Sequence, residues 1–366
     1  MDFNLDEAQQ ELRGLAADLL AREATQERLE AHEKNGAAYE AGIWKALGQA
    51  GLLGVCVPEE QGGAGLGPVE LTVLLREIGV KVAPVPFYAS FSLAAVPIAR
   101  HGTDEQKALL AQLAEGATIL TGAYREIGPA GTVATTARRD GDGFVLDGVK
   151  TFVPYAGEAS RILIPAQVEG EGIGVFLVEP GAVTITGHPS ATTEPLSRVE
   201  LSGVRVGADA LLGGTADGAA WTTLRRSAVA GAVALSSGVI EGALNLTTEY
   251  VKTREQFERA LAQFQAVTMQ IGDVYIAKRA LDVAVWAASY RLEVGGDDVD
   301  EVLAIASYNA ADPVVKALYT CQHLHGGIGL DVTYPLHRYF AWAKHSGHLL
   351  GGAEDQLDTL GALVGA

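Results

Sequence analysis

The chain has 366 residues, of which 48% are hydrophobic, so it is long enough for two or three domains around a large buried core. Its 27 Lys and Arg against 45 Asp and Glu give a formal net charge of −18, which argues against nucleic acid as a partner because phosphate binding needs a basic surface. Two cysteines in apolar surroundings and no run of the ~18 apolar residues that a membrane span needs lead us to expect a cytoplasmic protein without a membrane partner.

The first part of the chain is predicted to be helical. Apolar residues recur at helical spacing from residue 5 to 24, with Asn4 placed to cap the helix. A second helical run, 42–53, leads into the glycine-rich stretch 57–65, which predicts a turn and not a phosphate-binding loop, because no strand precedes it. Thr103 and Gln106 have capping-box spacing and predict another helix start. We place this helical domain at residues 1–116.

Residues 117–216 have a different texture and predict a small antiparallel β domain. Residues 122–212 are rich in Val, Thr, Ile and Gly, with short alternating runs such as 143–148 and 174–178. From 217 to 366 the helical period returns, with breaks at 254–263, at 295–298 and at Gly326-Gly327. Long helices joined by short breaks predict a helical bundle.

Two motifs in this last part resemble the C-terminal signature of the acyl-CoA dehydrogenase family. The first is Arg254-x-x-Phe257 with Phe264-Gln265 after it, and the second is 324–329, Leu-His-Gly-Gly-Ile-Gly, followed by the tyrosine-rich run 334–339. The resemblance covers essentially the whole chain. It implies an α+β, mainly α fold: an N-terminal helical domain, a middle antiparallel β domain and a C-terminal four-helix bundle.

In that family the arginine and the Phe-Gln pair of one subunit hold the ADP half of the FAD on its neighbour. A planar guanidinium suits pyrophosphate oxygens, and aromatic rings offer a face to the dinucleotide. Glu258 and Ala260 depart from the family's Gly and Pro, and His323 stands where a glutamine is usual. The resemblance implies these cofactor-binding residues: Arg254, Gln256, Phe257, Phe264, Gln265, His323, Gly326 and Gly327.

The same resemblance shows that the usual catalytic carboxylate is missing. The family removes an α proton of an acyl-CoA with a carboxylate beside the flavin. The position of that glutamate six residues after Lys344 is Leu350, and the alternative position on the first long helix is near Ala228. The flavin-ring segments are also altered, at 125–132 and at Phe152-Val153-Pro154. We therefore assign no catalytic residue to this chain.

The pattern is similar to the non-catalytic subunit of the heterotetrameric acyl-CoA dehydrogenases of actinobacterial steroid catabolism. It implies a homologous catalytic partner in a two-plus-two heterotetramer, with an acyl-CoA, such as a sterol side-chain thioester, as substrate of the complex. Two alternatives stay open: a self-sufficient homotetramer with an unrecognised base, and a flavin-free scaffold for a partner. The five histidines from 323 to 348 lack the carboxylate or thiolate spacing of a metal site, so we expect no metal.

Overall fold

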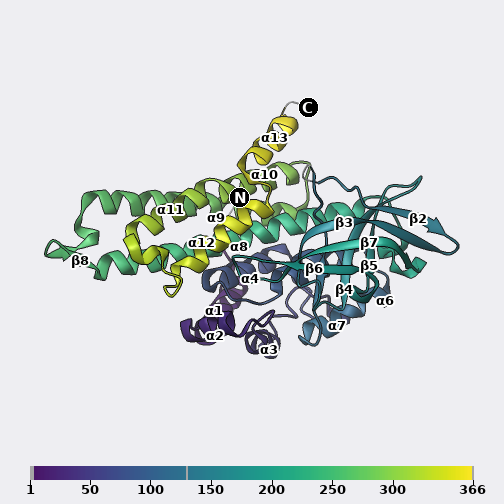
Figure 1. Ribbon diagram of the computed structural model, residues 1–366, viewed down its shortest axis with the longest axis horizontal. Helices are drawn as coiled ribbons and strands as arrows, with labels where there is room; N and C mark the ends of the chain where they lie inside the picture. Colours follow the sequence, from purple (N-terminus) through teal and green to yellow (C-terminus); the bar gives the residue numbers. More distant parts are fainter. Residues whose placement is uncertain (1–3, 129–130, 365–366) are drawn as a thin grey trace. The chain divides into compact units, whose positions relative to one another are not determined.

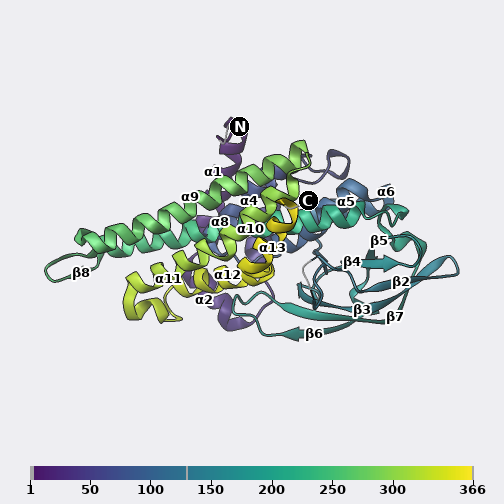
Figure 2. The ribbon, with the colours of Figure 1, turned by 90° about the horizontal axis from the view of Figure 1, so that it is seen from above.

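The computed structural model describes residues 4–128 and 131–364, which form two compact units (Figures 1 and 2). The bundle unit contains the described residues up to Lys34, then Thr72–Ala83 and the chain from Val229 onward. The sheet unit contains Asn35–Leu71 and Pro84–Ala228. The predicted fold class, α+β and mainly helical with a β middle part, is confirmed. The division into domains at 116 and 216 stays a prediction.

Short helices make up the first third of the chain. The first begins at Asp6, whose carboxylate accepts the Gln9 N–H while the Gln9 side chain accepts the Asp6 N–H, so Asp6 and not Asn4 is the cap. The predicted Thr103 and Gln106 capping box is confirmed. The helices are α1 Glu7–Glu23, α2 Gln26–Asn35, α3 Ala41–Gln49, α4 Pro68–Lys81, the π-helix Tyr88–Ala95, α5 Val96–His101, α6 Asp104–Lys107 and α7 Leu109–Ala114.

The predicted turn at 57–65 is confirmed, and its glycines have a steric cause. Gly62 has a left-handed φ of 80° after the 3₁₀ turn Glu59–Gln61. A Cβ on Gly63 would lie 2.0 Å from the carbonyl oxygen of Val57. Only glycine fits that close approach of two backbone segments, so the stretch is glycine-rich for packing reasons.

The β part is a seven-stranded sheet, and the cluster of buried hydrophobic residues that packs on it lies in the sheet unit. It differs from the predicted antiparallel sheet, because β4 pairs in parallel with both β1 and β2 while the other pairs are antiparallel. These parallel pairs join strands far apart in the chain, which alternation within one strand does not reveal. The strands are β1 Leu120–Gly122, β2 Thr136–Asp140, β3 Gly143–Pro154, β4 Arg161–Val168, β5 Ile173–Val178, β6 Thr184–His188 and β7 Leu196–Val206.

The last part of the described chain is helical, and all three predicted breaks are confirmed. Two further breaks make the helices more numerous than the predicted four, because Pro313 starts a new helix and Gly351 has a positive φ of 90°. In Figures 1 and 2, α8 and α9 run side by side and meet at the hairpin of β8 and β9. The elements are α8 Ala219–Thr253, β8 Glu255–Gln256, β9 Arg259–Ala260, α9 Gln265–Val294, α10 Val299–Ala311, α11 Pro313–His325, α12 Leu336–Leu349 and α13 Gly352–Val364.

Buried charges fasten α4, α8 and α9 together inside the bundle unit. The Arg76 guanidinium donates to the Ser237 hydroxyl over 2.8 Å and to Asp282 over 3.0 Å, and Lys278 pairs with Asp282 over 2.8 Å. These contacts favour one register of the helices, because a shift of one helix would leave a buried charge unpaired, which is costly. The network therefore fixes the α8 and α9 pair that carries the hairpin.

Helix α8 corrects one expectation from the sequence. It contains an 18-residue window with a mean hydropathy of 1.5, which is apolar and long enough to cross a membrane. Of that window, 89% is buried inside the protein. An all-round apolar helix of this kind is what the core of a large soluble fold requires, and α8 is such a core helix.

Candidate cofactor-binding site

The β8 and β9 hairpin, which links α8 to α9, presents Arg254, Gln256 and Phe257 to solvent. Arg254 follows the last turn of α8, where its N–H donates to the Tyr250 carbonyl over 2.8 Å and its carbonyl accepts the Leu261 N–H over 2.9 Å. Its backbone is therefore fixed on both sides. Its guanidinium stays exposed and is available to an anion.

The turn of this hairpin is strained. Phe257 and Glu258 both have positive φ values, 54° and 62°, which a two-residue type I′ turn requires and which glycine or asparagine normally supplies. The hairpin thus still forms with Glu258 in place of the family's glycine. Phe257 is 86% exposed at its tip, so it is not a core residue.

Replacing Glu258 with glycine should relieve part of this strain. A left-handed conformation costs a residue with a Cβ about 1 kcal/mol, so amide exchange of the hairpin should slow about fivefold in Glu258→Gly. Hydrogen exchange measured on the hairpin amides checks this. Glu255→Gly on the neighbouring strand is the matched control and should speed exchange, and faster exchange in Glu258→Gly would contradict the strain.

Phe264 and Gln265 lie where the hairpin connection becomes α9. Phe264 is the N-cap of α9 and Gln265 its first, exposed residue. The rings of Phe257 and Phe264 meet edge to face at 6.3 Å, and the Arg259 guanidinium lies 3.9 Å from the Phe264 ring centre. The aromatic residues of the first motif thus form one surface group beside the helix end.

The second motif ends α11 in an exposed turn. Gly326 is the C-cap with a φ of 63°, so the chain itself needs glycine there. Gly327 is different: its φ is not in the left-handed region and a Cβ there would meet nothing within 4 Å among the described residues. The backbone at Gly327 is thus open to close approach by another molecule. His323 is exposed on the same helix.

Tyr250 brings the two motifs together. Its hydroxyl donates to the His325 carbonyl over 3.2 Å, and its ring stacks on the His325 ring at 4.3 Å with planes 22° apart. Tyr250 lies four residues before Arg254 on α8, and His325 directly precedes Gly326. Sequence reasoning placed His325 in the second motif without giving it a role, and it missed Tyr250, although a tyrosine one helical turn before Arg254 shares its face of the helix.

Both positions expected for a catalytic carboxylate carry buried apolar residues. Leu350, the C-cap of α12, is 5% exposed. Ala228 is fully buried, and its carbonyl accepts the Tyr88 hydroxyl over 3.1 Å. Glu354 and Asp355, the acids nearest Leu350 in sequence, are exposed in the first turn of α13.

The altered segment 125–132 is held by a buried ion pair within the sheet unit. Glu126 accepts Lys150 together with the N–H groups of Ala134 and Thr135 and the Thr135 hydroxyl. Lys150 also donates to the Pro165 carbonyl over 2.6 Å. Pro129 and Ala130 of this segment lie outside the described residues. The other segment, 152–154, ends β3: Phe152 has a φ of 53°, and the Pro154 carbonyl accepts the Thr121 hydroxyl over 2.7 Å.

A buried cluster of phenols adjoins Arg125. Tyr124 hydrogen-bonds Tyr88 and Arg125, and Glu194 adds its charge near Tyr88 and Tyr155. Burial, followed by these neighbours, raises the pKa of Tyr88 and of Tyr155 well above the usual range, and burial also raises the pKa of Tyr124. All three phenols therefore stay protonated at neutral pH and cannot act as a base. Within residues 4–128 and 131–364, no group of three or more His, Cys, Asp and Glu side chains could hold a metal.

Comparisons with known proteins agree with this fold and site. A family model described as "Acyl-CoA dehydrogenase, N-terminal domain" matches residues 6–117, and one described as "Acyl-CoA dehydrogenase, C-terminal domain" matches 220–364. Acyl-CoA dehydrogenase FadE27 of Mycobacterium tuberculosis is 34% identical over 375 residues, covering 99% of this chain and 98% of that protein.

Two solved structures of paired subunits are similar over nearly the whole chain. One is a variant of the Tcur3481-Tcur3483 steroid acyl-CoA dehydrogenase, with 39% identity, a TM-score of 0.92 and 98% of each chain covered. The other is the ChsE4-ChsE5 complex from Mycobacterium tuberculosis, with 34% identity, a TM-score of 0.93 and coverage of 100% of this chain and 99% of that one. The chain belongs to the acyl-CoA dehydrogenase family, whose cofactor is FAD.

Proposed function

We propose that this chain is the non-catalytic subunit of a heteromeric acyl-CoA dehydrogenase. It supplies the contacts to the ADP half of an FAD whose flavin ring and catalytic base lie on a homologous partner. The observation that carries the proposal is a contrast. The two cofactor motifs are exposed and joined through Tyr250, while both candidate base positions, Leu350 and Ala228, are apolar and buried.

The exposed residues suit the ADP half of a dinucleotide. Arg254 offers fixed donors to the diphosphate, and Phe257 and Phe264 offer aromatic faces. The bare backbone at Gly327 permits close approach, and Gln256, Gln265 and His323 add exposed hydrogen-bonding groups. These groups face out of the chain, as a cofactor shared with a neighbour requires.

When bound, FAD accepts the hydride that leaves the β carbon of an acyl-CoA while a carboxylate removes the α proton. This chain offers no such carboxylate at 228 or 350, and the phenols beside Arg125 stay protonated. The partner therefore supplies the base. Its substrate is an acyl-CoA thioester, and the paired steroid acyl-CoA dehydrogenase at 39% identity favours a sterol side chain as the acyl group.

The partner is a homologous catalytic chain in a two-plus-two heterotetramer, by analogy with the paired structures. We place the complex in the cytoplasm, with the chain divided into domains at 116 and 216. The two free thiols agree with a reducing compartment: Cys321 is buried, and burial raises its pKa to about 11.

The flavin content of the purified chain and of the purified complex tests the proposal. The chain alone should hold little FAD and should not oxidise any acyl-CoA, and the complex with its partner should hold about one FAD for every two chains. Flavin absorbance against protein concentration measures both. Stoichiometric flavin in the isolated chain would favour a self-sufficient enzyme instead, and a fully active complex with all its FAD contacts on the partner would favour a scaffold.

A further inference from the structure

The rings of Tyr250, His325 and Tyr334 form one aromatic cluster next to the exposed glycine turn, here called the stack, in which His325 is buried and the two tyrosines are half-buried. The ring centre of His325 lies 4.3 Å from that of Tyr250 and 5.3 Å from that of Tyr334, the two tyrosine rings lie 6.3 Å apart, and His325 is 3% exposed. The rings come from α8, from the end of α11 and from the segment before α12. Tyr250 lies one turn before Arg254, and His325 is the residue before Gly326. The stack therefore joins the two halves of the proposed cofactor site from below.

The hydrogen bonds of His325 define its charge state. Its Nδ1 lies 2.8 Å from the Cys321 carbonyl, which can only accept, so Nδ1 carries the proton. Its Nε2 is buried and has no hydrogen-bond partner within the described part of the chain. A second proton on Nε2 would be a buried donor without an acceptor. The stack is thus built for a neutral imidazole.

No carboxylate is among the described contacts of the imidazole. From α8 it faces Tyr250, from the loop it faces Tyr334, and on its own helix it faces the Cys321 carbonyl. Asp331 and His337 lie on either side of Tyr334 in the sequence. Asp331 is bonded to the N–H and hydroxyl of Thr333, and His337 has its Nδ1 against the Tyr334 carbonyl.

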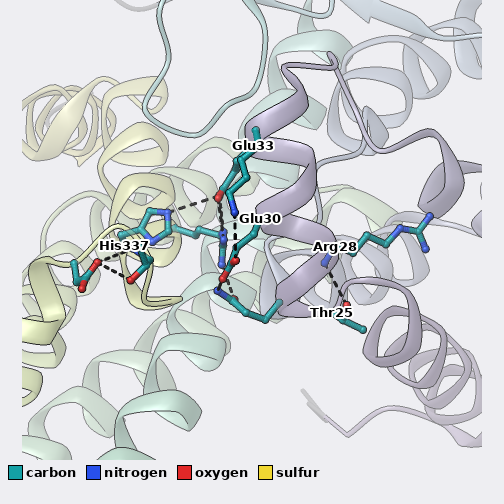
Figure 3. A network of polar contacts seen from close by, with 10 residues as sticks. Thr25, Arg28, Glu30, Glu33 and His337 are labelled. Carbon is teal, nitrogen blue, oxygen red and sulfur yellow. Dashed lines mark hydrogen bonds and ion pairs between the residues drawn. The ribbon is translucent and has the colours of Figure 1, made fainter.

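The α12 end of this arrangement is held by an ion pair in the bundle unit. Arg338 on α12 donates to Glu33 on α2 over 2.9 Å and to Gln26 over 2.7 Å. Figure 3 shows Glu33 reaching from α2 toward His337, with 3.7 Å between Nε2 and the carboxylate. The segment carrying Tyr334 is therefore held at its far end.

We propose that His325, kept neutral in contact with Tyr250 and Tyr334, is the positioning residue that holds the Gly326-Gly327 turn in register with Arg254. This inference rests on the proposed function. Burial lowers the pKa of His325 below 6.5, although its bond to Cys321 acts the other way. With the pKa depressed in the closed stack, the stack is fully stable above pH 6.5 and loses stability as pH falls below that value. Acid should therefore open the turn.

The pH dependence of FAD release from the purified complex, followed by flavin fluorescence between pH 5 and 8, tests this. Wild-type affinity should fall below pH 6.5, by at most ~tenfold for each pH unit. His325→Phe keeps an aromatic ring but cannot be protonated, so its profile should be flat. His348→Phe, on an exposed histidine of α12, is the matched control and should keep the wild-type profile.

Variants of Tyr250 separate its hydroxyl from its ring. Tyr250→Phe loses one hydrogen bond and should weaken FAD binding about two- to tenfold, and Tyr250→Leu loses the stack as well and should weaken it further. In the isolated chain, hydrogen exchange of the 326–330 amides should speed up in Tyr250→Leu and stay close to wild type in Tyr250→Phe.

Two results would overturn the inference: a wild-type pH profile in His325→Phe, or unchanged FAD affinity and amide exchange in Tyr250→Leu. A wild-type complex without FAD would overturn the proposed function, and with it the cofactor role of the stack. The exchange measurement needs no flavin, so it still decides whether the rings hold the turn.

Discussion

Lys150→Met should destabilise the sheet unit by about 3 kcal/mol, because it leaves the Glu126 carboxylate buried without its cation. The Lys150 side chain is fully buried and that of Glu126 is 5% exposed. Burial lowers the pKa of Lys150 to about 8 despite the pairing, and the donors around Glu126 outweigh its burial and lower its pKa. A lower midpoint of urea-induced unfolding would measure this loss of stability.

The matched control removes both charges. Lys150→Met combined with Glu126→Gln leaves no buried charge, so it should recover most of the stability that the single change loses. The depressed pKa also gives a pH dependence. Between about pH 8 and 10.5 the unfolded chain binds more protons at Lys150, so the contribution of this residue to stability rises with pH. A double variant as unstable as Lys150→Met would show that packing, and not charge, dominates this site.

Arg254→Ala should weaken FAD retention by the complex about 10- to 100-fold, because a charge-assisted hydrogen bond to the diphosphate contributes roughly 1.5–3 kcal/mol. The guanidinium is exposed at the protein surface, so the melting temperature of the isolated chain should change little. Turnover on the flavin that remains bound should also be unchanged, since Arg254 lies on the ADP side. Flavin titration and single-turnover bleaching by an acyl-CoA measure the two effects separately.

Lys252→Ala is the control for Arg254→Ala. It removes the same positive charge two residues earlier, where the Lys252 ammonium pairs with Glu249 over 3.0 Å. Two residues of an α-helix differ by about 200° in direction, so Lys252 faces away from Arg254. FAD retention should fall less than about threefold, as expected for screened charge alone. Equal losses in the two variants would mean that net charge, and not the Arg254 contact, holds the cofactor.

Local sequence signals predicted local structure well. The capping box of Thr103 and Gln106, the turn at 57–65 and the break after Gly326 each depend on residues a few positions apart, and the structure has all three. The boundary at Asp312 was missed although Pro313 marks a helix start. The type of secondary structure could thus be predicted wherever neighbouring residues alone determine the backbone conformation.

Long-range pairing was not readable in the same way. Tyr250 and His325 are 75 positions apart, and Lys150 and Glu126 are 24 apart. No local periodicity or motif in the sequence therefore indicates either contact. The parallel pairing of β1 with β4 is also set by the whole sheet and not by either strand. The cofactor motifs were found through a family resemblance, and the residues that support them from beneath were not.

The two neighbouring glycines differ in what a substitution there reports. Any side chain at position 326 strains a φ of 63°, so its effect combines folding with binding. A side chain at 327 enters open space, so the isolated chain should tolerate almost any residue there. A series of variants at 327 would therefore measure how much space remains between this backbone and a molecule bound next to it. Effects on folding would contribute little to the result.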